Sequence, residues 1–457
     1  MTRPTPDPIA RLADALGTLP AGVTGDARLH RSSWRTMRFA NSWIHQPHVE
    51  SGATVSLRVV ADGRIATATT TDLSDAGIGS LAATALALAR VAPREPKFPG
   101  FPEPDGTIAP VAVSAATRRL SVDAAARLAA SAIEAARAEV PDARVSGAVH
   151  VGAESITVLN SSGLRRSTER TAAEASVLVE RLDTDPPVSG WAEGSEWDAT
   201  RLDPRRLGRV AARRVPTAPV RSIRPGRYPV VLRVPAAAEL VGFLGHLGFN
   251  GHGELEGWSC LAKRRGRRIV PPSFELTDDG RSPLSLPQAI DYEGAAKRRT
   301  PLIEDGRAAG PALDLVTAGR LGATTTGHGM PPESPWGEYG PSPCQMIVGA
   351  GDATEAEMIR SMRRGLVVTR FHYVRIVHPS RSIITGMTRD GTYLVEDGEI
   401  VAPVRNLRFT QSVLGALAGI EQIGRARERV GDERGFAAVT TPALLTRDFR
   451  FTSATVF

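Results

Sequence analysis

The sequence predicts an α+β fold of two domains, a mixed α/β N-terminal domain followed by a β-rich C-terminal domain. At 457 residues the chain is too long for one small hydrophobic core. In the first half, segments with the apolar period of strands alternate with segments that have the period of helices. Residues 213–229 contain four prolines and no periodicity, which is typical of a linker. We therefore expect domains at 1–212 and 230–457, joined by a linker at 213–229.

The N-terminal half contains predicted helices between predicted strands. Ser121 is a favourable N-cap for the longest helix, and Pro141 follows its end. Asn41 and Asn160 each open a stretch that leads into a further strand, an echo that indicates two related strand-pair units. Helices are expected at 10–19, 80–92 and 121–140, and strands at 33–46, 53–71 and within 145–183.

The C-terminal half starts with a buried-type strand and an apolar helix at 236–248. The stretch 251–345 is dense in Pro and Gly and predicts short strands, including "RRIVP" and "SFELTDD", between irregular loops. Within it, 327–344 cannot be regular structure and is expected to be a mobile or partner-ordered loop, with His328 mobile rather than ligating. A helix leading into a strand at 353–377, a hairpin turning at 396–399, a helix from Ser412 and a final strand follow.

Composition limits the classes of partner and compartment. The formal net charge is +7, and only Lys97, Lys263 and Lys297 are lysines, so arginine carries the excess. The basic clusters 205–214 and 263–268 are not interleaved with aromatic residues, which favours solvated surfaces over a nucleic-acid site. No apolar run reaches the roughly 18 residues that span a bilayer, and the first residues do not resemble a signal peptide. We expect a cytoplasmic protein without a membrane or nucleic-acid partner.

Three ordered tracts carry a resemblance to a known family: "MIRSMRRGLVVTRFHYV" (358–374), "SIITGMTRDGTYLVEDGEIVAPVRNLRFTQSVLGAL" (382–417) and "PALLTRDFRF" (442–451). With "RFANSWIHQ", "ALALARVAP" and "LNSSG" in the N-terminal half, the chain resembles the TldD/PmbA family. Its bacterial and archaeal members are described as zinc metallopeptidases and, earlier, as modulators of DNA gyrase. The resemblance implies a two-domain TldD/PmbA-type fold, dimerisation, and a peptide groove built largely from the C-terminal domain.

In the catalytic members of that family, a helix after the linker carries His-Glu-x-x-x-His. The resemblance implies that the two histidines bind zinc and that the Glu activates the metal-bound water. The equivalent stretch here is "ELVGFLGHLGFNGHGELEG" (239–257). If His252 takes the place of the second histidine, Leu247 stands at the first ligand and Gly248 at the general base. Neither residue can perform that role.

A shifted zinc site at His246, His252 and Cys260 is the alternative, because all three are zinc ligand types. The two histidines are six residues apart, which on a straight helix places them about 120° apart, on different faces. A bend could bring them together, but the acids Glu254 and Glu256 lie downstream rather than between them. The other interpretation is a glycine-rich junction between helix and loop, with histidines that bind no metal.

The peptide groove is assigned on the resemblance. His372 and His378 are six residues apart, which on a strand places both on one face, where substrate or subunit contact is expected. The segment 382–394 is expected to form part of the groove, through Thr385, Gly386, Met387 and Thr388, with a core hairpin as the alternative. A groove that pairs its main chain with an extended peptide accepts unstructured substrates with limited side-chain selectivity.

These patterns predict a non-catalytic, PmbA/TldE-like subunit that acts in the proteolysis of unstructured peptides. The expected partner is a TldD-like zinc-bearing subunit in a heterodimer, or a second copy of the chain in a homodimer. We expect this chain to bind no zinc, and the partner subunit to hold it. Two alternatives stay open: an active metallopeptidase with the shifted site, and a gyrase- or nucleic-acid-binding modulator without enzymatic activity.

Overall fold

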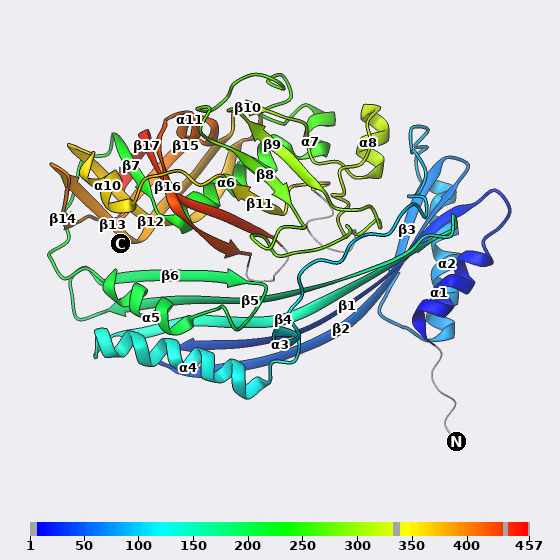
Figure 1. Cartoon of the computed structure of the whole chain (residues 1–457), viewed down its shortest axis with the longest axis horizontal. Helices are drawn as coiled ribbons and strands as arrows, with labels where there is room; N and C mark the ends of the chain where they lie inside the picture. Colours follow the sequence, from blue (N-terminus) through cyan, green and yellow to red (C-terminus); the bar gives the residue numbers. More distant parts are fainter. Residues whose placement is uncertain (1–6, 332–338, 433–436, 456–457) are drawn as a thin grey trace.

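The computed structural model describes residues 7–331, 339–432 and 437–455. A long curved sheet built by the N-terminal half runs the length of the molecule (Figure 1). Helices cover one face of this sheet, and the C-terminal half lies against the other (Figure 1). The mixture of separate sheets and helices confirms the predicted α+β class.

The N-terminal sheet has six strands in the order β3-β2-β1-β4-β5-β6, with every neighbouring pair antiparallel. Its strands are β1 (Thr24–Ala40), β2 (Trp43–Ala61), β3 (Arg64–Thr70), β4 (Arg144–Asn160), β5 (Arg165–Arg181) and β6 (Val188–Glu196). Its helices are α1 (Pro8–Gly17), α2 (Asp75–Val91), α3 (Ala115–Arg118), α4 (Val122–Glu139) and α5 (Pro204–Arg213).

The strand order is symmetric about the pairing of β1 with β4. Each half runs helix, three antiparallel strands, helix: α1-β1-β2-β3-α2 in one and α4-β4-β5-β6-α5 in the other. The turns at Asn41 and Asn160 occupy equivalent places, after β1 and after β4. The sequence echo at these two asparagines therefore corresponds to a repeated strand topology.

Side chains of β1 alternate strictly between the two faces of the sheet. Leu29, Met37 and Phe39 are buried beneath the helices, within two apolar clusters that α1, α2, α4 and α5 complete. The intervening residues, which include Arg28 and Trp34, point to the opposite face, which we call the inner face. The inner face is mostly polar, and the C-terminal half covers part of it.

The C-terminal half forms an eleven-stranded sheet in which β17 pairs with both β15 and β7. The strands are β7 (Arg227–Leu232), β8 (Leu276–Asp279), β9 (Arg299–Glu304), β10 (Arg307–Ala308), β11 (Gln345–Val348), β12 (Arg364–His378), β13 (Ile383–Glu396), β14 (Glu399–Pro403), β15 (Leu407–Ser412), β16 (Ile420–Gly431) and β17 (Ala438–Ala454). The helices are α6 (Val234–Phe249), α7 (Gly251–Glu256), α8 (Leu315–Leu321), α10 (Glu355–Arg360), the 3-10 turn η1 (Pro379–Arg381) and α11 (Val413–Ala418).

The double pairing of β17 closes β7, β12, β13, β15 and β17 into a barrel. The rings of Phe371, Phe409 and Phe449 pack together in its core, with the centroids of Phe371 and Phe409 4.6 Å apart. The helix α6 packs against β12 and β17, and its leucines belong to the same apolar cluster. One continuous core therefore joins the barrel to the helix that follows the linker.

Several local expectations differ from the structure in the Pro/Gly-dense stretch. "SFELTDD" supplies β8, but "RRIVP" forms no strand and contributes one isolated bridge, between Arg268 and Arg307. The short helices α7 and α8 were not expected. Asp314 initiates α8 through a capping box with Thr317, and Gly322 ends it in the left-handed conformation. The expected linker at 213–229 begins at the last residue of α5 and overlaps the start of β7, and its bounds stay a prediction.

Across the described ranges, no helix is long and apolar enough to cross a membrane.

The aromatic cluster of the barrel gives the first testable prediction. Phe409 is fully buried against two other rings, so Phe409→Ala leaves a cavity and should cost about 4 kcal/mol of unfolding free energy. Phe409→Leu keeps most of the apolar volume and should cost about half as much. Urea unfolding of both variants measures the difference. Equal losses would contradict a close-packed ring cluster.

Candidate functional site

The stretch 239–257, which the resemblance aligns with the zinc motif of catalytic relatives, forms two helices with a bend between them. Pro235 lies in the first turn of α6, and the helix ends at Asn250. The side chain of Asn250 then caps α7 by accepting a hydrogen bond from Gly253 N at 2.8 Å. His246 therefore lies on α6 and His252 on α7, on either side of the bend.

The two key positions of the motif are filled by packing residues. Leu247 is fully buried in the core cluster. At Gly248 an added Cβ would approach Leu261 Cδ1 to 2.8 Å, closer than a real Cβ contact. The carbonyl of Gly248 accepts hydrogen bonds from Ser259 Oγ and Arg265, each at 2.9 Å. A longer side chain at 248 cannot be accommodated without displacing this layer.

The histidines of this stretch contact other groups. The ring of His246 lies between Trp258 and Tyr339, with ring centroids 5.5 and 5.4 Å away, and burial lowers its pKa. His252 Nε2 lies 2.8 Å from Glu256 Oε1, one turn along the chain.

The neighbouring acid and thiol are also accounted for. Glu254 is paired with Arg265 at 2.6 Å. Cys260 is buried, and burial raises the pKa of its thiol to about 11. Throughout the residues that the structure describes, no group of three or more His, Cys, Asp or Glu side chains is arranged to hold a metal ion.

The expected groove residues lie in the middle of the barrel wall and at its rim. Thr385 and Met387 pair with β12 on one side and β15 on the other, and Gly386 between them pairs with β15 opposite the bulge of β12, so the segment lies inside the sheet rather than at its edge. Thr388 is fully buried, and its hydroxyl accepts a hydrogen bond from Leu407 N. A groove at these residues would have to be lined by side chains rather than paired with main chain.

His372 and His378 lie on the outer half of β12, the first half-buried and the second exposed.

His328 was expected to be mobile, and this is wrong. It is 2% exposed, and its Nε2 lies 3.1 Å from Asp278 Oδ1. Although burial opposes its charge, His328 beside it lowers the pKa of Asp278. Residues 327–331 and 339–344 of the loop are described and contain no helix or strand, while 332–338 lie outside the described residues.

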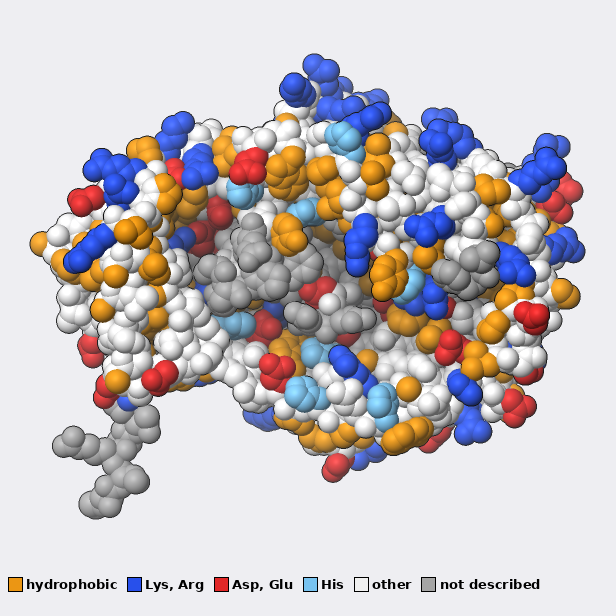
Figure 2. All heavy atoms as spheres, turned by 180° about the vertical axis from the view of Figure 1, so that it is seen from behind, with side chains coloured by type: hydrophobic (Ala, Val, Ile, Leu, Met, Phe, Trp, Pro, Cys, Tyr) orange, Lys and Arg blue, Asp and Glu red, His pale blue; other side chains and the backbone are white. Residues whose placement is uncertain are grey.

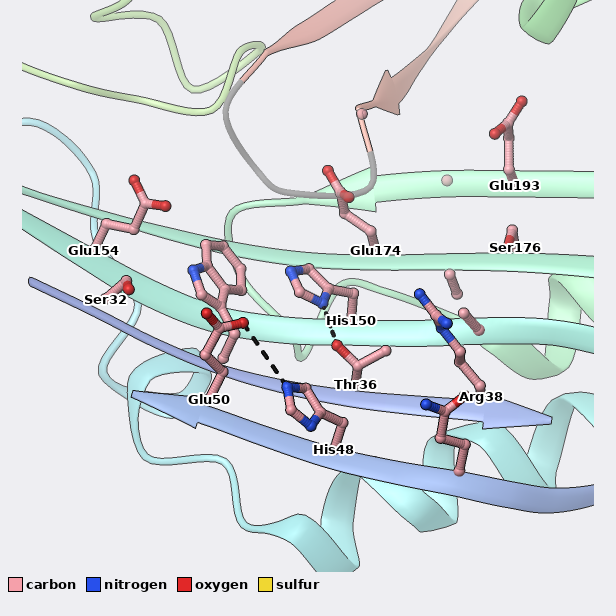
Figure 3. Close-up of a pocket in the computed structure, with 16 residues that line it drawn as sticks. Ser32, Thr36, Arg38, His48, Glu50, His150, Glu154, Glu174, Ser176 and Glu193 are labelled. Carbon is pink, nitrogen blue, oxygen red and sulfur yellow. Dashed lines mark hydrogen bonds and ion pairs between the residues drawn. The ribbon is translucent and has the colours of Figure 1, made fainter. Parts of the chain in front are cut away.

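A cavity of about 680 Å³ lies against the inner face of the N-terminal sheet. Seen from behind, the surface is hollowed between the two halves, with acidic and histidine side chains around the hollow (Figure 2). Figure 3 shows that its polar lining comes from adjacent strands of one sheet. The lining side chains include Ser32, Trp34, Thr36 and Arg38 of β1, Gln46, His48 and Glu50 of β2, His150 and Glu154 of β4, Glu174 and Ser176 of β5, and Glu193 of β6.

Aromatic and imidazole groups form a platform in the cavity. The ring of His150 stacks on Trp34 with centroids 4.5 Å apart, and its Nδ1 lies 2.7 Å from the Thr36 hydroxyl (Figure 3). These two contacts fix both the plane and the rotation of the imidazole. Such a flat, oriented surface with carboxylates around it can bind polar groups and stack against planar ones.

A buried ion pair closes one end of the cavity. Burial opposes the charge of Glu154, but Arg170 at 2.5 Å and His30 at 3.4 Å lower its pKa to about 2. Glu154 is therefore ionised at neutral pH. Ion pairs also join the two halves of the molecule: Arg58, which pairs with Asp26 of β1, also pairs with Glu293, and Arg429 pairs with Glu196.

None of the cavity residues was predicted as a site residue. The available signal was the alternation in β1, where Ser32, Trp34, Thr36 and Arg38 occupy every second position and so share one face of the strand. That pattern identifies a polar face, and only the tertiary structure shows that part of the face is left open.

The basic clusters of the sequence are partly neutralised by acids from other segments. Four arginines of these clusters lie within 3.1 Å of a carboxylate oxygen. The pairs are Arg206–Glu428, Arg213–Glu139, Arg265–Glu254 and Arg268–Asp305.

The fold and the site define a class of two-domain α+β proteins, with a barrel, an apolar helix after the linker, and a polar cavity between the halves. Two family models match the chain: "PmbA/TldA metallopeptidase C-terminal domain" over residues 225–453, and "PmbA/TldA metallopeptidase domain 1" over residues 25–89. The chain belongs to the TldD/PmbA metallopeptidase family.

Curated relatives are distant and match in part. The "Metalloprotease TldD homolog" of Buchnera aphidicola is 26% identical over 205 residues, which cover 44% of this chain and 41% of the relative. A "Metalloprotease" of Methanothermobacter thermautotrophicus is 25% identical over 228 residues, covering 48% of this chain and 47% of the relative. The match therefore spans less than half the length of each of these relatives.

Solved structures match over nearly the whole chain. TldE from Thermococcus kodakarensis superposes with a TM-score of 0.87 at 20% identity, covering 98% of this chain and 100% of that one. A Thermotoga maritima protein described as a proposed modulator of a DNA gyrase gives a TM-score of 0.83, also at 20% identity, with coverages of 97% and 99%. At this identity the superpositions establish the fold alone.

The ion pair beside the cavity can be tested by removing one partner. Arg170→Met leaves the Glu154 carboxylate buried without its guanidinium partner, and should cost about 3–5 kcal/mol of unfolding free energy. Arg170→Met/Glu154→Leu removes both charges and should recover a large part of that loss. Urea unfolding measures both variants, with Arg181→Met, at a surface pair, as the control. A loss no larger than that of the control would contradict a buried, charged pair.

Glu239 on α6 gives a prediction on pH dependence. Burial, and then the charge of Glu193, raise its pKa to about 7, while Arg370 acts in the opposite direction. A carboxyl whose pKa is raised on folding stabilises the fold fully below its unfolded pKa of about 4.5, and this contribution is lost as pH rises through 7. Between pH 5 and 8 the wild-type chain should lose about 2 kcal/mol more unfolding free energy than Glu239→Gln. Urea midpoints at both pH values measure the difference, with Glu103→Gln as the exposed control.

Proposed function

We propose that this chain is the zinc-lacking subunit of a two-subunit TldD/PmbA metallopeptidase that degrades unstructured peptides. The observation that carries the proposal is the packing at the motif positions. Leu247 lies in the core and Gly248 is closed over by Leu261, where a catalytic relative would need a ligand and a general base. The residues present do not fit a zinc ion bound in the manner of the family.

The remaining donors do not favour the shifted zinc site. His246 lies between two aromatic rings, and His252 pairs with Glu256. The nearest acid to a catalytic position, Glu254, is paired with Arg265 and so is not available as a base. Cys260 lies in the apolar core cluster.

The structural elements of the chain support a non-catalytic role in binding and assembly. The barrel, the linker helix and the cavity against the inner face are all present without the motif. A partner that bears zinc would supply the metal and the activated water, and this chain would contribute binding surface and assembly. The name TldE on a structure that matches along the full chain agrees with this assignment.

Metal analysis and reconstitution test the proposal. The chain purified alone should carry substoichiometric zinc and cleave no unstructured peptide, whereas mixing it with a zinc-bearing relative from the same organism should produce peptidase activity. His252→Ala should change neither the metal content nor the activity of the mixture, because His252 contacts Glu256 rather than a metal. Stoichiometric zinc that is lost in His252→Ala would instead establish the shifted site.

A further inference from the structure

The outer half of β12 has an unpaired edge. On one side β12 pairs with β13 along its whole length, from Arg364 to His378. On the other side it pairs with β7 only through Leu366–Val368. From Arg370 to His378 that second edge has no partner strand within the described residues, so its outward-facing N–H and C=O groups are available for pairing.

This edge exposes large apolar side chains. Tyr373 is 67% exposed, Val377 55% and Ile376 39%. Tyr373 has a φ of 54°, at an irregularity in the pairing between His372 and Arg375. A bulge with a bulky residue at positive φ is strained, and bulges redirect side chains. Here the bulge directs an aromatic ring into solvent, where the ring contacts its chain neighbours His372 and Arg375.

The same segment is basic. Residues 370–382 contain three arginines and two histidines and no acid. Arg370 is neutralised by Asp390, but Arg375 and Arg381 form no ion pair with any residue that the structure describes. The positive charge of this region also affects His372: burial, and then the charges of Arg389 and Arg370, lower the pKa of its imidazole. An incoming strand therefore gains from carrying carboxylates.

A second copy of the chain does not suit this edge. An isologous contact places the same patch on both sides of a two-fold axis. For the segment 370–382 it would bring unpaired arginines together with no acid to compensate, and like charges directly opposite each other are destabilising. Bulges and charges on an edge suppress pairing between copies, yet leave it open to an oppositely charged strand.

We propose that the edge of β12 from Arg370 to His378 is the docking surface for a carboxylate-bearing strand of a different polypeptide. That strand extends the sheet through main-chain hydrogen bonds, covers Tyr373, Ile376 and Val377, and pairs its acids with Arg375 and Arg381. This inference rests on the proposed function, in which the other polypeptide is the zinc-bearing subunit. Exposed Tyr and Arg are the residue types that contribute most to protein interfaces.

The experiment compares charge-reversed chains for binding to the zinc-bearing relative from the same organism. Arg375→Glu/Arg381→Glu should weaken the Kd about tenfold or more, and Tyr373→Ser should weaken it as well. The matched control is Arg119→Glu/Arg127→Glu, which changes the charge equally at exposed sites on the N-terminal domain. Hydrogen exchange should show protection of the amides of 370–378 on complex formation. Thermal melting of each variant verifies its fold.

The outcomes separate this inference from the proposed function. If the wild-type chain binds the relative and both Arg375→Glu/Arg381→Glu and Tyr373→Ser bind equally well, the docking surface is elsewhere, and the subunit assignment stands. If the wild-type chain does not bind the relative, the subunit assignment fails and this inference fails with it. If the chain forms a homodimer that Arg375→Glu/Arg381→Glu dissociates, the occupant is a second copy, which overturns the inference.

Discussion

The polar inner face of the N-terminal sheet is the constraint on which the rest of the molecule depends. A sheet with arginines on its inner face cannot be covered by an apolar layer, because each buried guanidinium needs acceptors. The C-terminal half supplies these acceptors from segments that are neither helix nor strand. Carbonyls of Tyr292 and Gly294 accept from Arg28 and Arg166, while Arg429 of β16 donates to the carbonyls of Pro283 and Leu284. The stretch 280–297 therefore stays out of regular structure, since a helix or strand would use its own carbonyls.

The same constraint explains the position of the cavity. Where acceptors of the C-terminal half reach the inner face, they bind its arginines: Arg58 pairs with Glu293, and Arg170, which pairs with Glu154 of the same sheet, also donates to Gln288 Oε1. Further along the same strands, the polar side chains around Trp34 and His150 line a cavity of about 680 Å³. A polar face tolerates this exposure at little cost, whereas an apolar face would not. The cavity is thus the uncovered part of one surface rather than a separately built pocket.

Local signals in the sequence were sufficient for most helices and strands, and insufficient for their assembly. Ser121 and Ser412 cap helices where expected, and the turn at Asp397–Gly398 closes the predicted hairpin, because caps and turns depend on neighbouring residues. Barrel closure depends on β17 pairing with β7 some two hundred residues away, which no periodicity encodes. For the site, the sequence alone identifies Leu247 and Gly248 as the residues at the positions where the resemblance implies a ligand and a base, whereas the burial of His328 against Asp278 required the tertiary structure.

The helix α6 is a packing element of the C-terminal core. Two glycines in and after this helix are sites of close approach: a Cβ at Gly245 of α6 would meet Met346 Sδ at 2.7 Å, and one at Gly251, the first residue of α7, would meet the Ala312 carbonyl at 2.4 Å. With Leu247 and Gly248 these positions let the helix lie close to β11 and to the loop before α8, so small and apolar residues are required where a metal site would need polar ones. Restoring ligands at 247 and 248 would bury polar groups in this layer and destabilise it. Under the proposed function, α6 serves to anchor the core that connects it to the barrel. The chain then contributes to peptide degradation through the surfaces that this core positions.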